Sequence, residues 1–481
     1  MKVKIKMKNS IGLLLVFLLF SCQHALDETV YSSFGPDNFF NSQEDAESLL
    51  LAAYAAEQKQ GTDGFRNILV MAEVNTDLLI IREGGLRGLA QPLEDFTWNP
   101  AHEFFATAWS RYYSAIYKAN LVIDYVPNID FDENRKSQII AEARFLRASN
   151  YIYLYDLFGP VPLITSSDVN ADDRPSRATE EEFVRFVENE LLEASTVLPA
   201  EQAEYGRVTK GAAWAFLTKF YLNNKKWDKV VERADELIDL GVYGLFDSQK
   251  RTDLFLIENE ENREFIYVRP HIAQPGLGTN YLPHAAPPNY KYRGAVKTNY
   301  ATQLKTLSSF LDSFHPVDER KEVIITSYED LNGNVIALGK DDARSFKFQE
   351  DLPATGADLG NDFPVVRFAD ILLSKAEALN ELNGPNQESI DLINQVREKA
   401  NVPLLSLSSF GDKAALRDHI LKERGWEFFT EELRRQDLIR HGRFIEYAKA
   451  RGKVAFDYQI RYPIPQSEID RNPNLIQNDG Y

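Results

Sequence analysis

Apolar residues recur at helical spacing in paired segments along much of this chain, and this pattern most restricts the fold. One pair spans residues 209–240 with a break at 223–226, and another spans 364–400 with a break at 383–386. Each pair is close to the roughly 34-residue length of a tetratricopeptide unit. A helical hairpin of this kind buries its apolar face only by stacking on neighbours. The pattern therefore favours a helical superhelix, with an irregular helical bundle as the alternative.

Three further segments are expected to be helices, at 103–126, 135–158 and 179–198. The last of them has a start signal in Thr179 and Glu182, which have the spacing of a capping box. In a capping box the threonine side chain and the glutamate side chain each accept a backbone N–H at the first turn. Helices thus account for most of the regular structure that we expect.

Two stretches lack this periodicity. Residues 247–360 are rich in Gly, Pro and Asn and include a short strand-like segment at 264–268, and residues 61–101 are also irregular. We therefore expect an all-α dominated chain: a scaffold of tetratricopeptide-like helical pairs at about 103–246 and 361–450. The two irregular stretches would be loop-rich, partly β insertions on that scaffold.

The N-terminus has the pattern of an export signal. Four lysines precede an apolar run at 11–20, which at about ten residues is too short to cross a ~30 Å hydrocarbon core as a helix. The run ends at Ser21 and Cys22, the only cysteine in the chain. This arrangement resembles a bacterial lipobox and predicts a signal peptide at 1–21 and lipidation of Cys22. The alternative is an ordinary cleaved signal with a chance cysteine.

The charge balance limits the partners. Lys plus Arg is 54 and Asp plus Glu is 72, so the formal net charge is −18. Removal of the leader takes four lysines and no acid, which leaves −22. Nucleic-acid binding requires a basic surface, so nucleic acid is not an expected partner. An anionic membrane would not attract such a chain either, and several acyl chains would have to provide the anchor.

Residues 270–300 form an unusual window in this acidic chain. They contain no Asp or Glu, five prolines and three cations, and four tyrosines: Tyr281, Tyr290, Tyr292 and Tyr300. An aromatic ring offers a flat apolar surface for the C–H face of a sugar, and its hydroxyl adds a hydrogen bond. Prolines lower the entropic cost of binding by restricting the loop. The window predicts a glycan-binding site, with partner contact and internal packing as alternatives.

A second group of candidate binding residues lies in and beside the irregular 61–101 stretch. It comprises Asn75, Asp77, Arg82, Arg87 and Trp98. Polar and aromatic side chains on a loop are suited to ligand contact, although Trp98 beside Pro100 is equally suited to cap the next helix.

The enzyme alternative rests on Glu423 and Glu427. At i and i+4 they share one helix face, whereas a glycosidase needs its two carboxylates on either side of the sugar bond. The same helical hairpin carries Arg424, Arg434, Arg435 and Arg440, so an ion network is the expected role. The seven histidines show no paired metal-ligand spacing, and neither a metal site nor a cofactor is expected.

Several short motifs follow one another in a fixed order after the cysteine. They are ARFLRA at 143–148, FGPVPL at 158–163, AEALNE at 376–381, ERGWE at 423–427, DLIR at 437–440, IP at 464–465 and NPNLIQNDGY at 472–481. Together they resemble the SusD/RagB family of outer-membrane nutrient-binding lipoproteins, over residues 22–481. One departure is Arg435-Gln436, where the family often has an aromatic residue, and it affects the expected local packing.

The resemblance implies a lipid-anchored protein of the cell outer membrane that is a carrier and not an enzyme. It would bind an oligosaccharide, or in some members a peptide, and pass it to a SusC-like TonB-dependent barrel. The acidic tract after Cys22 resembles the surface-display signal of Bacteroidota lipoproteins. The residues expected to contact the ligand are Asp77, Arg82, Trp98, Tyr281, Tyr290 and Tyr292. A surface glycoside hydrolase and a non-catalytic interaction scaffold are the alternatives.

Overall fold

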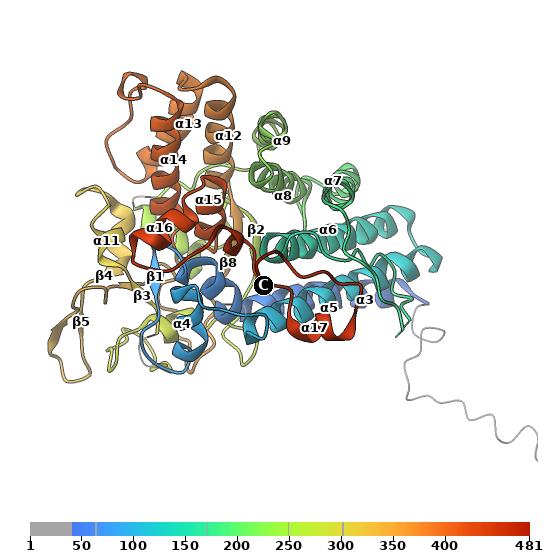
Figure 1. Cartoon of the computed structure of the whole chain (residues 1–481), viewed down its shortest axis with the longest axis horizontal. Coiled ribbons are helices and arrows are strands. Elements are labelled where there is room, and N and C mark those ends of the chain that lie inside the picture. The colour runs from blue at the N-terminus through green and yellow to red at the C-terminus, as the bar shows by residue number, and fades with distance from the viewer. Residues whose placement is uncertain (1–40, 63–64, 171, 249, 301–302) are drawn as a thin grey trace, which may run out of the picture.

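The computed structural model describes residues 41–62, 65–170, 172–248, 250–300 and 303–481. The expected signal peptide and Cys22 lie outside the described residues. Helices make up most of the regular structure, and the loop-rich part of the chain gathers on one side of them (Figure 1). The expectation of an all-α dominated fold is confirmed.

The helices stack one on the next in a continuous series. The series consists of α3 (Gln43–Thr62), α5 (Glu103–Tyr125), α6 (Glu133–Phe158), α7 (Glu180–Val197), α8 (Lys210–Asn223), α9 (Trp227–Asp239), α12 (Phe368–Asn383), α13 (Gln387–Lys399) and α14 (Lys413–Phe428). Each of α5 to α9 contacts the one before it, and α9 then packs against α12, far along the chain. α12 contacts both α13 and α14. Figure 1 shows this series running from the blue-green helices to the orange ones.

Local signals at the helix ends explain why the sequence predicted these elements well. The Thr179 side chain accepts from the Glu182 backbone N–H, and the Glu182 carboxylate accepts in return from Thr179, which completes the capping box. Asn386 caps α13 by accepting from Ser389 N, and Gly384, with φ +74°, ends α12. A side chain at that positive φ is strained, so glycine is suited to the helix end.

The pair expected at 364–400 begins differently from the expectation. Its first residues form strand β8 (Phe363–Arg367), and the helix starts only at Phe368. β8 pairs antiparallel with β2 (Phe265–Arg269), which confirms the strand expected near 264–268. All five residues of β2 and four of β8 are buried, so this two-stranded ribbon is part of the main core. Long-range pairing of this kind leaves no signal within either segment.

The region between β2 and β8 contains short elements only. They are α10 (Tyr281–Ala285), β3 (Lys305–Thr306), α11 (Ser308–Leu311), η5 (Glu319–Val323), β4 (Ile324–Ile325), β5 (Ser327–Glu329), β6 (Val335–Ala337) and β7 (Arg344–Ser345), preceded by η3 (Arg251–Phe255) and η4 (Ile257–Asn259). We call residues 270–362 the loop module. β5 and β6 form a hairpin that projects from the molecule (Figure 1).

The other irregular stretch, 61–101, holds more regular structure than its sequence indicates. It contains η1 (Phe65–Val74), a π-helix, and α4 (Arg87–Asp95), with β1 (Leu79–Ile80) between them. β1 pairs with β3 and therefore brings this stretch against the loop module.

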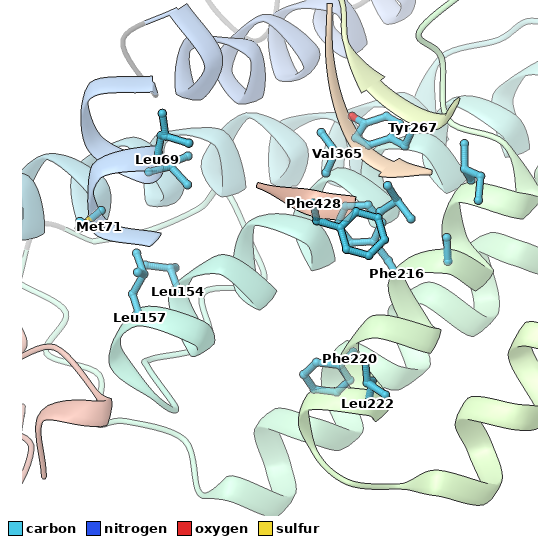
Figure 2. Close-up of a cluster of buried hydrophobic side chains, with 14 of the residues drawn as sticks. Leu69, Met71, Leu154, Leu157, Phe216, Phe220, Leu222, Tyr267, Val365 and Phe428 are labelled. Atoms are coloured by element: carbon cyan, nitrogen blue, oxygen red, sulfur yellow. The ribbon is translucent and has the colours of Figure 1, made fainter. Parts of the chain in front are cut away.

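The C-terminal segment returns across the helices. It contains α15 (Arg434–Arg440), α16 (Phe444–Ala450), η7 (Asp457–Ile460) and α17 (Gln466–Arg471), and the short η2 (Val126–Asn128) and η6 (Leu407–Ser409) complete the regular elements. Buried side chains from the helical series, the β2–β8 ribbon and α14 meet in one large core, part of which Figure 2 shows. Among the described residues, no helix combines the length and apolar character needed to span a bilayer.

Candidate functional site

The loop module has a small apolar core of its own. Leu282, Ala286, Phe346, Ala354 and Leu359 are buried together, and the rings of Tyr290 and Tyr292 pack partly against them. A loop with such a core presents its side chains in a fixed arrangement, which lowers the conformational cost of binding a ligand.

Tyr290 and Tyr292 form an ordered aromatic pair at the surface of this core. Their ring centroids are 5.0 Å apart in a T-shaped arrangement, and both side chains are half-buried. The Tyr290 hydroxyl donates to Glu350 Oε1 at 2.9 Å. Burial and then the Glu350 carboxylate raise the pKa of Tyr290, so its hydroxyl stays protonated at neutral pH. Two rings thus have fixed positions and retain part of their surface for contact with solvent or a ligand.

The three cations of the window have local partners. Lys291 is ion-paired with Glu329, and Arg293 Nε lies 3.4 Å from Glu350 Oε1. Lys297 is buried and its Nζ lies 5.2 Å from the centre of the Tyr292 ring. Glu329 and Glu350, which lie outside residues 270–300, therefore compensate the positive charge of Lys291 and Arg293.

Tyr300 belongs to the loop module and Arg82 to the 61–101 stretch, and Gln303 lies between the two segments. Tyr300 is 37% exposed, and its ring lies 4.5 Å from that of His284. Gln303 hydrogen-bonds both His284 Nδ1 and the Tyr300 carbonyl, and a Cβ on Gly84 would come within 2.8 Å of the Gln303 side chain. The turn at Gly84 is therefore packed against Gln303. Arg82 is half-exposed, with Asp341 at 3.9 Å.

The other predicted contact residues have internal partners. Asp77 accepts from Arg434 Nε and Nη2, both at 2.7 Å, and Trp98 Nε1 donates to the Tyr481 hydroxyl at 2.8 Å. Tyr281 is 3% exposed and donates to the Ser345 carbonyl. The structure thus does not bring Asp77, Trp98 and Tyr281 together with the Tyr290–Tyr292 pair. Their binding role stays a prediction, and the site below is built from the other residues.

Asn75 and Arg87 are likewise engaged within the fold. Asn75 Nδ2 donates to the Tyr462 hydroxyl at 2.6 Å, and Arg87 Nη1 donates to Glu94 at 2.8 Å. Arg435, at the departure from the family pattern, is buried with its guanidinium 4.5 Å from the centre of the Tyr462 ring. Stacking on Tyr462 explains how the core accommodates an arginine at this position.

Large aliphatic side chains are also exposed around the loop module. Val296 is 80% exposed, Val335 is 78% exposed and Leu331 is 65% exposed, and Leu352 is half exposed. Backbone hydrogen bonds connect these segments, from Ala295 to Leu352 and from Leu331 to Asn289. Aliphatic side chains without aromatic or polar groups suit contact with a protein surface better than contact with a sugar. Sequence reasoning missed these residues because nothing in a loop without periodicity distinguishes outward from inward positions.

Glu423 and Glu427 are completely enclosed. Glu423 accepts from Arg320 at 2.7 Å and from Arg397 at 2.5 Å, and Glu427 accepts from Arg251 at 2.5 Å and Arg367 at 2.6 Å. Burial alone raises the pKa of Glu423, but the cations around it, Arg320 foremost, lower it to about 2. A general acid needs access to its substrate and a pKa near neutrality. Neither carboxylate meets this requirement, and the predicted ion network is confirmed.

The partners in this network differ from the expected ones. The arginines that neutralise Glu423 and Glu427 come from η3, η5, β8 and α13, whereas Arg424, Arg434 and Arg440 bind Asp437, Asp77 and Glu377. Sequence proximity suggested the wrong arginines, because the chain brings them in from distant segments. Among the described residues, no cluster of His, Cys, Asp and Glu has an arrangement that would hold a metal ion.

Two family models match separate parts of the chain. The model described as the SusD family matches residues 343–481, and the model described as "Starch-binding associating with outer membrane" matches residues 25–222. These segments contain most of the helical series and the C-terminal segment. Most of the loop module lies between them.

Whole-chain relatives agree with this match. The chain is 28% identical to SusD-like protein P38 of Formosa agariphila, over 96% of both chains. It is 25% identical to the starch-binding protein SusD of Bacteroides thetaiotaomicron, over 88% of this chain and 87% of that protein.

Solved structures show the same fold. A SusD superfamily protein from Parabacteroides distasonis superposes with a TM-score of 0.81 at 25% identity, over 92% of this chain and all of that chain. A laminarin-binding SusD-like protein gives a TM-score of 0.78 at 24% identity, over 92% of this chain and its own full length. The ordered motifs, the helical series and both family models lead to one assignment: the chain belongs to the SusD/RagB family.

Proposed function

We propose that this protein is a surface lipoprotein that binds a neutral oligosaccharide without transforming it and delivers it to a SusC-like TonB-dependent outer-membrane barrel. The observation that carries the proposal is the ordered Tyr290–Tyr292 pair, which keeps part of its ring surface accessible on a preformed loop core. A starch-binding relative at 25% identity supports a glycan as the ligand.

The chemistry of the site favours a neutral sugar. The Tyr290, Tyr292 and Tyr300 rings offer apolar faces, and the half-exposed Arg82 would offer hydrogen-bond donors. Lys291 and Arg293 are already compensated by Glu329 and Glu350, so no free basic cluster remains there to bind an acidic glycan. Stacking and hydrogen bonds would supply the affinity.

Affinity electrophoresis with starch and laminarin in the gel tests glycan binding. We expect Tyr292→Ala to weaken retardation by the bound glycan at least fivefold, because stacking on an aromatic ring contributes about 1 kcal/mol or more. Tyr117→Ala is the matched control, since Tyr117 is an exposed tyrosine on α5, away from the loop module. Equal retardation of both variants by a glycan that binds the wild type would contradict the proposed site.

The exposed aliphatic residues suit the barrel contact. A projecting hairpin with Leu331 and Val335 in solvent presents an apolar surface that a partner would cover. We expect the double change Leu331→Asp and Val335→Asp to reduce co-purification with the barrel. Leu404→Asp, an exposed leucine outside the loop module, is the control. Unchanged recovery of the barrel with the double variant would show that the hairpin is not the surface that contacts the barrel.

Lipidation of Cys22 would place this binding surface outside the cell. Several acyl chains give a stable anchor, whereas the acidic chain itself has no attraction for an anionic bilayer. We expect the Cys22→Ala protein to leave the detergent-rich phase in which the wild type partitions. Retention of the variant in that phase would contradict a lipid anchor at this residue.

A further inference from the structure

A cavity of about 100 Å³ lies inside the helical part of the molecule, away from the loop-module tyrosines. Its apolar walls include Leu157 of α6, Phe216 and Leu222 of α8, and Val365 of β8. Figure 2 labels all four, with Leu157 on α6 and Phe216 and Leu222 on α8. The cavity also borders α15, so residues of both segments matched by the family models enclose it.

The cavity has a polar rim. Asp156, Lys219, Asn223 and Gln436 line it and are half-buried, whereas the four apolar wall residues named above are buried. Lys219 Nζ lies 3.2 Å from Asp370 Oδ2 and Asp156 Oδ2 lies 3.7 Å from Arg435, so the charges at the rim have partners. An apolar interior with a few polar groups at its edge is typical of small-molecule sites. The paired charges favour a neutral occupant.

Two buried polar groups at the cavity lack partners. Tyr112 is 0% exposed and its hydroxyl has no hydrogen-bond partner among the described residues, and the same holds for Arg435 Nε, in a side chain that is 1% exposed. A buried hydroxyl without a partner is costly. Tyr112 stacks on Tyr153 at 5.3 Å, which fixes the ring and keeps the hydroxyl in place. A ligand with one hydrogen-bonding group would remove this cost.

We propose that this cavity binds a small neutral ring compound that carries one hydroxyl group, of the size of phenol. Apolar protein cavities of about 150 Å³ take up benzene, so one ring is the largest occupant for a cavity of about 100 Å³ with an open rim. The ring would contact Phe216, Leu222 and Val365, and its hydroxyl would hydrogen-bond Tyr112. Because the cavity lies between the two matched segments, the ligand would also stabilise their contact.

Fluorine NMR with 4-fluorophenol as the probe tests binding to the full-length mature protein. We expect saturable line broadening with the wild type, and none with Ala72→Phe, because Ala72 lines the cavity and a phenyl group there fills it. Tyr117→Phe, on the same helix as Tyr112 but exposed, is the matched control and should broaden the line as the wild type does. Absence of saturable broadening with the wild type would overturn the proposal.

A second comparison tests the hydrogen bond. One net hydrogen bond makes 4-fluorophenol bind about fivefold tighter than fluorobenzene, and Tyr112→Phe should reduce this preference to less than about twofold. An unchanged preference would overturn the role of Tyr112. A crystal of the unsubstituted protein soaked in phenol locates the site without any variant: density between Phe216 and Val365 supports the proposal, and density only on the surface overturns it.

Discussion

Glu427 shows how a single residue connects distant parts of this chain. It accepts hydrogen bonds from Arg251 and Arg367 and lies 3.1 Å from Arg320, three cations from three different segments. Burial alone raises the pKa of Glu427, but Arg251 and the other arginines lower it well below its ordinary value. A buried carboxylate with three guanidinium partners holds their three segments together. Its removal leaves buried cations without a compensating charge.

Glu427→Gln should therefore destabilise the protein strongly. We expect a loss of about 3 kcal/mol or more in the free energy of unfolding, because three buried guanidinium groups lose their shared anion. Urea denaturation measures it. The control is Glu446→Gln, whose exposed pair with Arg443 should contribute less than about 1 kcal/mol. Similar losses in both variants would show that the buried network contributes no more than a surface pair.

Glu73 is a buried carboxylate whose pKa is raised, whereas that of Glu427 is lowered. Burial raises the pKa of Glu73 from 4.5 to about 8, although backbone N–H groups of Glu432 and Thr430 donate to it. Above pH 5 the unfolded chain is ionised at this residue, while the folded chain retains the proton until about pH 8. The folded state binds more protons in this interval, so the contribution of Glu73 to stability falls as pH rises.

Glu73→Gln should remove the decrease in stability that Glu73 causes as pH rises. We expect the stability of the variant relative to the wild type to rise by more than about 1 kcal/mol between pH 5 and pH 8, since glutamine carries no titrating proton. Urea denaturation at both pH values gives the difference, in which the contributions of other acids cancel. A stability difference that is independent of pH would contradict a raised pKa at Glu73.

Residue roles were the least predictable part of the molecule from sequence. The pairing of Glu423 and Glu427 with arginines follows from their chemistry, but Arg251 and Arg320 lie too far along the chain to be identified as the partners. Tyr281 and Tyr300 belong to the same acid-free window, yet one is buried and the other is exposed. Only the fold of the loop module distinguishes them, because tertiary contacts determine side-chain direction there.

Elements defined by local chemistry agree closely with the sequence reading. The capping box at Thr179 and the glycine after α12 mark helix ends through residues that are only a few positions apart in the sequence. The β2–β8 ribbon and η1 depend on contacts between distant segments, so the sequence shows one strand and neither its partner nor the π-helix.

Gly294 determines how closely the segment that carries Tyr290 and Tyr292 can pack against the backbone of Leu352. A Cβ at this position would lie 2.1 Å from the Leu352 carbonyl oxygen, so Gly294→Ala must displace the backbone next to Tyr292. We expect at least a threefold loss of glycan affinity and faster proteolysis of the loop. Gly339→Ala, where a Cβ meets nothing within 4 Å, is the control and should change neither measurement. Wild-type affinity for Gly294→Ala would show that the loop tolerates this displacement.

The charge of the whole molecule leads to a prediction for solution conditions. The chain carries a formal net charge of −18, but the tyrosine pair lies among compensated charges. Binding of a neutral glycan should change by less than about twofold between 50 and 500 mM salt, because screening acts only on uncompensated charge. Isothermal titration at both salt concentrations measures it. A tenfold loss at high salt would instead indicate an acidic ligand.

The antiparallel β2–β8 pairing makes the two ends of the loop module neighbours, with Arg269 directly opposite Phe363. Because both ends of the module leave the scaffold at one place, we expect that the module of a related chain could replace it while the helical series keeps its stacking. The exchange has one condition. Arg320 and Lys347 lie inside the module and bind the carboxylates of Glu423 and Glu431, so a donor cassette must carry two cations at these places. Under the proposed function, ligand preference and part of the stability of the scaffold are thus encoded on the same stretch of chain.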